Sequence, residues 1–434
     1  MQTAVEKNSP TIDIYPPDHP KGWWMMFFVF CINFSLSGCL LSWGLYQRAY
    51  LEGDYRNEKS STVTLIGGTC AALVYGLGIV FGKLIQIYGI RWPLIIGTIL
   101  YPVGLVLASF STSIWHLFLT QSLIPGIGCS LVLFSASHLP SQWFDRRRGL
   151  ASGIAVSGTS VGAATILQIT QVMINRWGVR WALRVSALIY LALLLLPCIF
   201  LQERIRCCPT SEEETIERSK ESRRRRIARI MRELIDLSLL LNPKVALLAV
   251  SATIYIISYT SPYYFLPSYA TFIGLPDEMG AIATMVLTLS SGVGRIVAGW
   301  LADRYGSINI LFITLTLSGV VTLLIWPFAT SLALLMVFAI LFGLFQASFM
   351  SLVPVITASL VPLHEAASAI GVVMGIQFPG DIVGPAVFGA LVDATAPNTS
   401  YLPAELFNGA CCIIASLLLL PLRWMITRTF WTKV

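Results

Sequence analysis

Stretches of about 20 apolar residues recur along the whole chain, separated by short breaks that contain glycine, proline or charged residues. Runs such as LLIWPFATSLALLMVFAILFGLF would be apolar on every face of a helix, and apolar and polar residues do not alternate in them. A helix of about 20 such residues crosses a bilayer core, whereas barrel strands alternate over roughly 10 residues. The pattern predicts an all-α polytopic membrane protein with twelve spanning helices, near residues 22–45, 63–87, 91–110, 114–138, 149–173, 180–201, 245–272, 279–301, 308–328, 331–359, 367–392 and 405–427.

The composition agrees with this pattern. Of the 434 residues, 56% are hydrophobic and 12% are charged, whereas about 25% of the residues in an ordinary soluble domain are charged. A soluble fold is excluded, because it would have to expose many apolar faces to water. Residues 1–21 are polar and contain prolines and acidic residues, so we expect a retained tail and not a cleaved signal.

One long polar segment, residues 203–243, divides the predicted helices into two sets of six. The segment contains ten Lys and Arg residues, and basic residues close to span ends are retained in the cytoplasm. We therefore expect a multi-pass protein of the plasma membrane with both termini in the cytoplasm. The expected parts are an N-terminal tail (1–21), a six-helix bundle (22–202), a basic cytoplasmic linker (203–243), a second six-helix bundle (244–428) and a C-terminal tail (429–434).

An internal repeat relates the two sets of helices. GKLIQIYG, residues 82–89, closes the second predicted helix, and GWLADRYG, residues 299–306, closes the eighth; the offset, 299 − 82 = 217, is half of 434. A second echo has nearly the same spacing, since RGLASG opens the fifth helix at Arg148 and EAASAIG opens the eleventh at Glu365. Six helices per repeat are typical of transporters with two parallel halves.

The GWLADRYG segment resembles the loop signature of the major facilitator superfamily, and the likeness covers the whole chain. Within it, the chain is similar to the monocarboxylate-porter family, especially its fungal branch, through PD at 17–18, GW at 22–23, WFDRRRGLASG at 143–153, GR at 294–295, and GP at 384–385 followed by Gly389 and Asp393. The resemblance implies the major facilitator fold of two six-helix bundles. It also implies a conformational switch at helix ends, formed by Gly299, Asp303, Arg304, Gly306 and Arg148.

Three positions depart from the family pattern. Leu41 stands where the animal proton-coupled lactate carriers have a lysine, and Ser291 stands where they have an acidic residue. In the first loop signature, Gln86 replaces the usual aspartate. The proton–lactate mechanism of those carriers is therefore not transferred to this chain, and the substrate stays open.

Arg295 lies well inside the eighth predicted helix, in LSSGVGRIVAG. A charge at the centre of a span costs about 2.5–3.5 kcal/mol on insertion scales, so it must face a cavity or a partner. A guanidinium group can bind a carboxylate through two parallel hydrogen bonds. We expect Arg295 to bind an anionic substrate with Ser291 one turn away; the alternative is a structural pair between helices.

Asp381, in IQFPGDIVGP of the eleventh predicted helix, is the candidate for proton coupling. A carboxyl group removed from water can take up and release a proton during a transport cycle. Two alternatives stay open at this point: Asp381 could be the permanent counter-ion of Arg295, or it could line a polar cavity.

Several neutral polar residues within the spans are further candidates for contacts to the substrate. Helical spacing places Gln168 near Gln171, Gln377 near Asp381, and Tyr255 near Tyr259. The alternatives are packing for the tyrosines and hydrogen bonds between helices for the others. The candidates for substrate binding are Arg295, Ser291, Gln168, Gln171, Tyr255, Tyr259, Gln377 and Asn33.

The sequence predicts a secondary transporter of a small, monocarboxylate-like organic anion, with proton coupling left open. No G-x-x-x-x-G-K-[ST] loop occurs, so ATP is not expected to drive it. The sequence shows no H-E-x-x-H motif and no clustered carboxylates, and we expect no enzymatic activity, cofactor, metal site or nucleic-acid partner. The alternatives are an efflux pump for a secondary metabolite or drug, and a membrane sensor that signals through residues 203–243.

Overall fold

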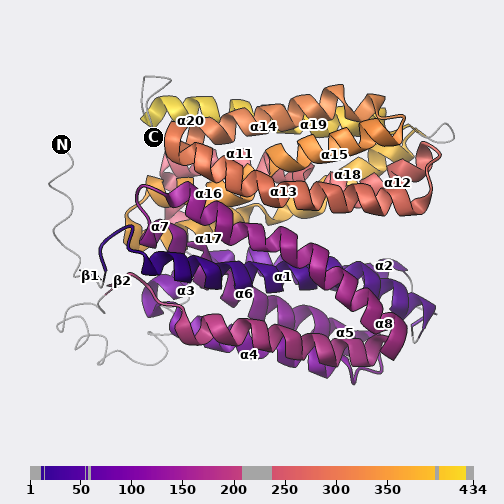
Figure 1. The fold of residues 1–434 in the computed structure, drawn as a ribbon, viewed down its shortest axis with the longest axis horizontal. Helices are drawn as coiled ribbons and strands as arrows, with labels where there is room; N and C mark the ends of the chain where they lie inside the picture. Colours follow the sequence, from indigo (N-terminus) through magenta and orange to yellow (C-terminus); the bar gives the residue numbers. More distant parts are fainter. Residues whose placement is uncertain are drawn as a thin grey trace.

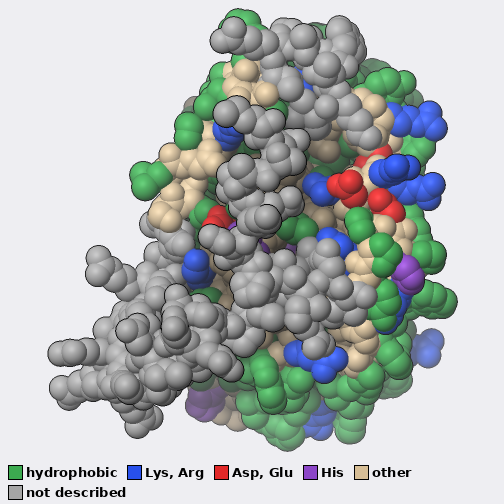
Figure 2. Space-filling model, turned by 90° about the vertical axis from the view of Figure 1, so that its left-hand side faces the viewer, with side chains coloured by type: hydrophobic (Ala, Val, Ile, Leu, Met, Phe, Trp, Pro, Cys, Tyr) green, Lys and Arg blue, Asp and Glu red, His purple; other side chains and the backbone are tan. Residues whose placement is uncertain are grey.

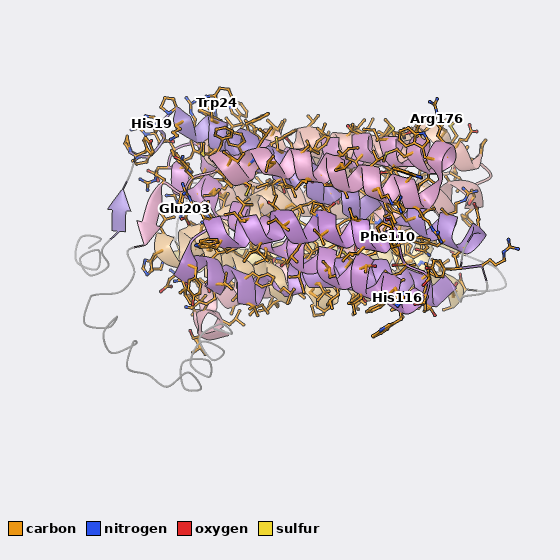
Figure 3. All side chains as sticks on the ribbon, turned by 90° about the horizontal axis from the view of Figure 1, so that it is seen from below. His19, Trp24, Phe110, His116, Arg176 and Glu203 are labelled. Carbon is orange, nitrogen blue, oxygen red and sulfur yellow. The ribbon has the colours of Figure 1, made fainter. Side chains whose placement is uncertain are left out.

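In the computed structural model the helices form two bundles that lie side by side with their long axes roughly parallel (Figure 1). The structure describes residues 11–13, 15–53, 55–56, 60–207, 237–395 and 400–426. We call the end at which the first helix begins and the last helix ends the terminal end, and the opposite end the distal end. Trp24 lies at the terminal end, and Phe110, His116 and Arg176 lie at the distal end (Figure 3).

The N-terminal bundle is formed by the first half of the chain. It contains α1 (Lys21–Glu52), α2 (Ser60–Gly76), α3 (Gly78–Tyr88), α4 (Arg91–Ala108), α5 (Ile114–Leu117), the π-helical turn η1 (Phe118–Leu123), α6 (Ile124–Ser137), α7 (Leu139–Trp143) and α8 (Arg148–Phe200). The C-terminal bundle begins with the 3₁₀ turn η2 (Leu237–Leu241). It continues with α11 (Pro243–Tyr259), α12 (Ser261–Phe272), α13 (Asp277–Tyr305), α14 (Ser307–Leu324), η3 (Trp326–Phe328), α15 (Leu332–Gln346), α16 (Ser348–Leu360), η4 (Leu363–Glu365), α17 (Ala366–Ile376), α18 (Phe378–Asp393), α19 (Leu402–Leu417) and α20 (Leu419–Ile426).

These elements make twelve membrane spans. Ten helical segments of the described chain are long and apolar enough to cross a bilayer, and the pair α2–α3, bent by 41°, makes an eleventh. The 53-residue α8 is in fact two helices, because Gly178 breaks it with φ 76° and ψ 169°. Counting both parts of α8 raises eleven to twelve, which confirms the predicted fold of a multi-pass integral membrane protein.

The internal repeat appears in the backbone as well as in the sequence. Gly89 ends α3 with φ 75°, and Gly306 ends α13 with φ 92°; their offset is 306 − 89 = 217. Glycine adopts this left-handed conformation without the steric cost that a side chain would add. The two glycines therefore make equivalent turns, each of which leads directly into the next span.

Part of the predicted N-terminal tail packs on the terminal end of the N-terminal bundle. Strand β1 (Thr11–Asp13) pairs antiparallel with β2 (Ile205–Cys207), which belongs to the start of the predicted linker. The Tyr15 ring stacks on Trp143 of α7 at 5.6 Å. Lys and Arg side chains surround this end in the space-filling view (Figure 2). Most of the predicted basic linker, residues 208–236, lies outside the described residues.

Candidate substrate-binding site and its switch

Arg295 projects from α13 into the contact between the two bundles and is 4% exposed. Its Nη1 donates hydrogen bonds to the Val156 carbonyl oxygen at 3.0 Å and to Ser160 Oγ at 3.2 Å, both on α8. Its Nη2 donates to the Tyr259 hydroxyl of α11 at 3.3 Å. Nε has no hydrogen-bond partner among the described residues. The guanidinium group thus joins three helices through neutral partners and keeps one donor for another group.

Aromatic and amide side chains surround this guanidinium group within the C-terminal bundle. The rings of Tyr259 and Tyr263 lie 5.9 Å apart, and Gln346 Nε2 of α15 donates to the Tyr263 hydroxyl at 2.8 Å. Tyr263 also interacts with Ser291 and with the charge of Arg295. Ser291 is 0% exposed and lies one turn before Arg295 on α13. The site therefore offers one positive charge surrounded by hydroxyl and amide groups.

Asp381 lies in the first turn of α18, separate from Arg295. Within the described part of the chain no ion pair joins the two side chains, so Asp381 does not serve as a bonded counter-ion in this conformation. Tyr75 of α2 interacts electrostatically with both Asp381 and Arg295. Tyr264 of α12 also interacts with Asp381. The half-buried carboxylate and the guanidinium group thus act on a common neighbour without neutralising each other through direct contact.

Gln377 occupies the break between α17 and α18 and is 4% exposed. Its backbone carbonyl accepts hydrogen bonds from Gly380 N at 2.9 Å and Asp381 N at 3.3 Å, which starts α18. Its Nε2 is buried and has no hydrogen-bond partner among the described residues. Gln377 therefore positions the backbone of Asp381 and holds an unused amide donor beside it.

The other predicted substrate contacts do not meet Arg295. Tyr255 is 0% exposed and donates to Ser318 inside the C-terminal bundle at 3.3 Å. Asn33 donates to the Val29 carbonyl of its own helix, and Gln171 donates to Asn175 at 2.9 Å. Gln168 is exposed. Among the predicted contacts, the structure brings Ser291 and Tyr259 close to Arg295.

The predicted switch residue Asp303 binds the start of α8 at the terminal end. Its Oδ1 accepts a hydrogen bond from Gly149 N at 2.7 Å, and its Oδ2 accepts one from Leu150 N at 2.9 Å. The first N–H groups of a helix lack partners within the helix and carry partial positive charge, so a carboxylate stabilises them. This contact ties α13 of one bundle to α8 of the other.

Glycines let α8 and α13 approach closely beside this carboxylate. A Cβ atom at Gly299 would overlap the carbonyl oxygen of Gly149, and one at Gly153 would overlap that of Arg295. The remaining switch residues do not cross between the bundles. Arg304 lies 3.9 Å from the ring centre of Trp300, and Arg148 donates to Asp145 at 2.8 Å. The close backbone contacts and Asp303 together join α8 to α13 at the terminal end.

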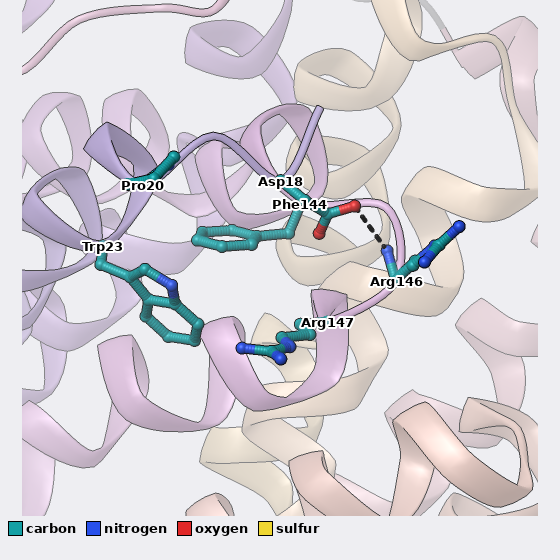
Figure 4. A pocket seen from close by; sticks show the side chains of 6 residues that line it. All are labelled: Asp18, Pro20, Trp23, Phe144, Arg146 and Arg147. Carbon is teal, nitrogen blue, oxygen red and sulfur yellow. Dashed lines mark hydrogen bonds between the residues drawn. The ribbon is translucent and has the colours of Figure 1, made fainter. Parts of the chain in front are cut away.

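A cavity of about 360 Å³ opens at the terminal end of the N-terminal bundle (Figure 4). Its lining residues are Asp18, Pro20, Trp23, Phe144, Arg146 and Arg147, and Asp18 accepts a hydrogen bond from Arg146 N at 3.3 Å. Arg295 lies ten residues (305 − 295) before the end of α13, which is about 15 Å along the helix. The cavity is thus separate from the central site.

Sequence reasoning did not assign three residues to the central site: Tyr75, Tyr263 and Gln346. Tyr263 comes four residues after Tyr259, and this helical spacing was the available signal. Pro262 intervenes and suggests a break, yet α12 begins at Ser261 and continues the direction of the chain far enough to keep the two rings in contact. Tyr75 and Gln346 lie on other helices, so only the packing of the spans brings them to Arg295.

Comparison with known proteins places these features in context. The chain matches the family model described as Major Facilitator Superfamily over residues 23–315 and 273–429. It is 29% identical over 394 residues to the agnestins efflux protein of Paecilomyces divaricatus, which covers 91% of this chain and 85% of that protein. It is 28% identical over 421 residues to monocarboxylate transporter 12 of Xenopus laevis, which covers 93% of this chain and 89% of that protein.

Two solved structures show the same fold at low sequence identity. The human organic anion transporter MFSD10 aligns with a TM-score of 0.70 at 14% identity, over 93% of this chain and 100% of that chain. The fucose:proton symporter FucP of E. coli aligns with a TM-score of 0.69 at 15% identity, over 92% of this chain and 99% of that chain. These likenesses concern the fold and not the substrate.

Proposed function

The chain belongs to the major facilitator superfamily of membrane transporters, and from this premise we propose that it moves a small organic anion across the membrane by alternating access. The substrate carboxylate binds Arg295 between the two bundles. Rocking of the bundles then exposes this site first at one end and then at the other. We place the protein in the plasma membrane with both termini in the cytoplasm, so the terminal end is the cytoplasmic end.

The observation that carries this proposal is the buried guanidinium group of Arg295 with neutral partners. Its hydrogen bonds go to Val156, Ser160 and Tyr259, and its Nε has no partner among the described residues. A buried charge without a counter-ion is costly in a membrane. A carboxylate at this position would neutralise the charge and accept hydrogen bonds from the planar guanidinium group.

The contacts at the terminal end support the transport cycle. Asp303 holds the start of α8 while the terminal end is closed, and the substrate site is then available from the distal end. Opening the terminal end requires Gly149 and Leu150 to leave the Asp303 carboxylate. The cost of breaking these bonds sets the balance between the two conformations.

Asp381 is the proposed site of proton coupling at the centre. With an empty site, Arg295 and an ionised Asp381 sum to zero charge; with both an organic anion and a proton bound, the sum is again zero. Binding the anion alone would leave one negative charge in the span, which is unfavourable in a medium of low polarity. The empty protein and the protein with both anion and proton bound can therefore change conformation more easily than the protein with the anion alone.

Efflux of a larger secondary metabolite is the second candidate function. It is favoured by the names of two relatives, the agnestins efflux protein and the fujikurins efflux protein of Gibberella fujikuroi, the latter 29% identical over 421 residues. Both functions use Arg295 for an acidic group. They differ in the size of the substrate and in the direction of net movement.

Counterflow in liposomes tests the role of Arg295. Liposomes that contain the purified protein are loaded with an unlabelled organic acid, and the labelled acid is added outside. The experiment is repeated with acids of increasing size. We expect saturable counterflow by the wild-type protein and a rise of at least about tenfold in the half-saturating concentration for Arg295→Gln, because charge-assisted hydrogen bonds are lost. Arg295→Lys keeps the charge without the planar fork and is expected to fall between the two.

Arg176→Gln is the matched control, since Arg176 is exposed at the distal end (Figure 3). Unchanged half-saturation in Arg295→Gln would refute the proposed site.

Counterflow at two external pH values, with Asp381→Asn beside the wild type, tests the proton coupling. Uphill accumulation of the acid by Asp381→Asn at the wild-type level would refute the role of Asp381.

A further inference from the structure

Helix α19, in the last span, carries a stripe of polar side chains that faces the interior of the C-terminal bundle. Glu405, Asn408, Cys412 and Ser416 recur at spacings of three and four residues, so they share one helix face. Glu405 is 1% exposed and the other three are 0% exposed. Insertion into a membrane does not require such a stripe. Its presence indicates a polar function inside the bundle.

The inner part of the stripe connects to the central site. Cys412 Sγ and Ser258 Oγ of α11 share a hydrogen bond at 3.2 Å, and Cys412 also interacts with Ser318 of α14. Ser318 in turn accepts the hydrogen bond from Tyr255. The ring of Tyr255 lies 6.3 Å from that of Tyr259, the partner of Arg295. Polar groups therefore follow one another from α19 to the guanidinium group.

The outer part of the stripe is different, because its polar atoms are unpaired. Oε1 of Glu405 and both amide atoms of Asn408 are buried without hydrogen-bond partners among the described residues. A buried polar atom without a partner costs about 1–3 kcal/mol, and a charged group costs more. The structure thus holds a carboxyl group that none of the described groups neutralises, one helical turn from an amide that is unpaired among the same residues.

In the described part of the chain, the groups that interact with Glu405 are the hydroxyls of two tyrosines. Tyr269 of α12 and Tyr401 before α19 interact with it, and Asp393 at the end of α18 interacts with Tyr401. Burial, Asp393 and Glu405 together raise the pKa of Tyr401. Helices α12, α14 and α15 contain no Lys, Arg or His. Lys244 of α11 and Arg423 of α20 lie at the terminal end, whereas α19 begins at the distal end (Figure 1).

We propose that Glu405 is a second proton-binding site of the transport cycle, separate from the central site and supplied from the distal end. A proton from water adds to the carboxylate oxygen and leaves a neutral carboxyl group; its release to water reverses the step. No other reactant is needed. The Asn408 amide can form a hydrogen bond with the carboxyl group in either protonation state. The proposal rests on the proposed transport function, since the proton is useful when coupled to a substrate.

Chemical labelling of the wild-type protein in liposomes tests the site without a mutation. Dicyclohexylcarbodiimide modifies protonated carboxyl groups in apolar surroundings, and mass spectrometry of the digested protein locates the modification. We expect modification of Glu405 in acidic buffer and its loss in alkaline buffer. Glu278, exposed near the start of α13, is the control and should stay unmodified. Absence of labelling at Glu405 at every pH, or labelling that does not change with pH, would overturn the proposal.

Counterflow of the Glu405→Gln variant separates this site from the central one. Glutamine imitates the protonated carboxyl group, so we expect counterflow to persist with a smaller change with external pH than in the wild type, the remaining change coming from Asp381. The half-saturating concentration in acidic buffer should be unchanged. Glu278→Gln should keep the wild-type response. A wild-type pH response in Glu405→Gln would contradict the proposal. An error in the proposed substrate site would appear as unchanged half-saturation in Arg295→Gln. The two proposals can therefore fail separately.

Discussion

The two bundles meet at two junctions that the repeat makes equivalent, yet the junctions are bonded differently. At the junction of α13 with α8, the Asp303 carboxylate accepts hydrogen bonds from Gly149 N and Leu150 N at 2.7 and 2.9 Å. At the junction of α3 with α17, the equivalent position, 303 − 217 = 86, holds Gln86. Its Oε1 is buried and has no hydrogen-bond partner among the described residues.

The glycine contacts of the two junctions are alike. A Cβ at Gly299 would overlap a backbone oxygen of α8, and a Cβ at Gly82 would lie 2.6 Å from the Ala367 carbonyl oxygen of α17. Glycine thus determines how closely each pair of helices packs. The carboxylate determines how strongly it is held, since a hydrogen bond to a charged group contributes about 1.5–3 kcal/mol. We infer that the α3–α17 junction separates first when the terminal end opens.

The largest effect on transport is expected from substitutions that prevent the close helix packing shared by both junctions. Gly299→Val and Gly82→Val both place a side chain against backbone that cannot rotate away, so the terminal end should fail to close. Overlap of this kind costs about 1–3 kcal/mol or more, and we expect counterflow to fall at least tenfold in both variants. Gly44→Val is the control, because a Cβ at Gly44 meets nothing within 4 Å. Equal rates in Gly299→Val and Gly44→Val would show that close packing is not required.

Removing the charge at the α13–α8 junction should show that the two junctions are held with different strength. Asp303→Asn loses the charge-assisted bonds to the start of α8, and a loss of about 2 kcal/mol shifts the equilibrium towards an open terminal end about thirtyfold. Spin labels on α7 and α16 at the terminal end would report this shift as longer distances. Gln86→Leu should change the distances little, because Gln86 Oε1 accepts no hydrogen bond from a described residue. Equal shifts in the two variants would refute the difference between the junctions.

Adding a charge to the weaker junction should have a smaller effect in the opposite direction. Gln86→Glu places a carboxylate near the start of α17, where the helix dipole favours negative charge by about 0.3–1 kcal/mol. The closed population should rise by a factor of about two to five. The same spin-label distances measure it. A shift towards the open state would mean that Gln86 does not face the helix start as the repeat implies.

The smallest effect is expected at Arg304. Its guanidinium group packs over Trp300 on the same helix and is exposed, so it does not join the bundles. Arg304→Gln should lose about 0.5–1 kcal/mol of local cation–π interaction and leave the junction distances unchanged. A distance change as large as that of Asp303→Asn would assign Arg304 a direct part in the switch.

Much of the fold could be predicted from the sequence, because a bilayer fixes the length and polarity of a spanning helix. The repeat also located the equivalent turns at Gly89 and Gly306. The contact of Arg295 with other helices was predictable, since a charge inside a span needs a partner. The residues around Arg295 were harder to predict. Tyr75 and Gln346 are common residues in spans, and their approach to Arg295 depends on how the helices cross.

The same limit applies to the switch and to α19. The sequence marked Asp303, but its bonds to Gly149 and Leu150 depend on the packing of two helices from different bundles. Glu405 coincides with the predicted start of the last span, where an acidic residue beside water would be ordinary. Two tyrosines interact with it in the folded chain: Tyr401, one turn earlier, and Tyr269 of α12. Tyr269 is far away in the sequence, so its approach to Glu405 depends on the packing of the helices.

A structure determined with a transported organic acid bound would test the binding of the substrate at Arg295. We expect a carboxylate oxygen of the acid to lie within hydrogen-bond distance of an Arg295 guanidinium nitrogen, with Tyr259 beside it. An acid bound elsewhere, for example in the terminal-end cavity beside Arg146 and Arg147, with Arg295 still bonded to Val156 and Ser160 alone, would contradict it.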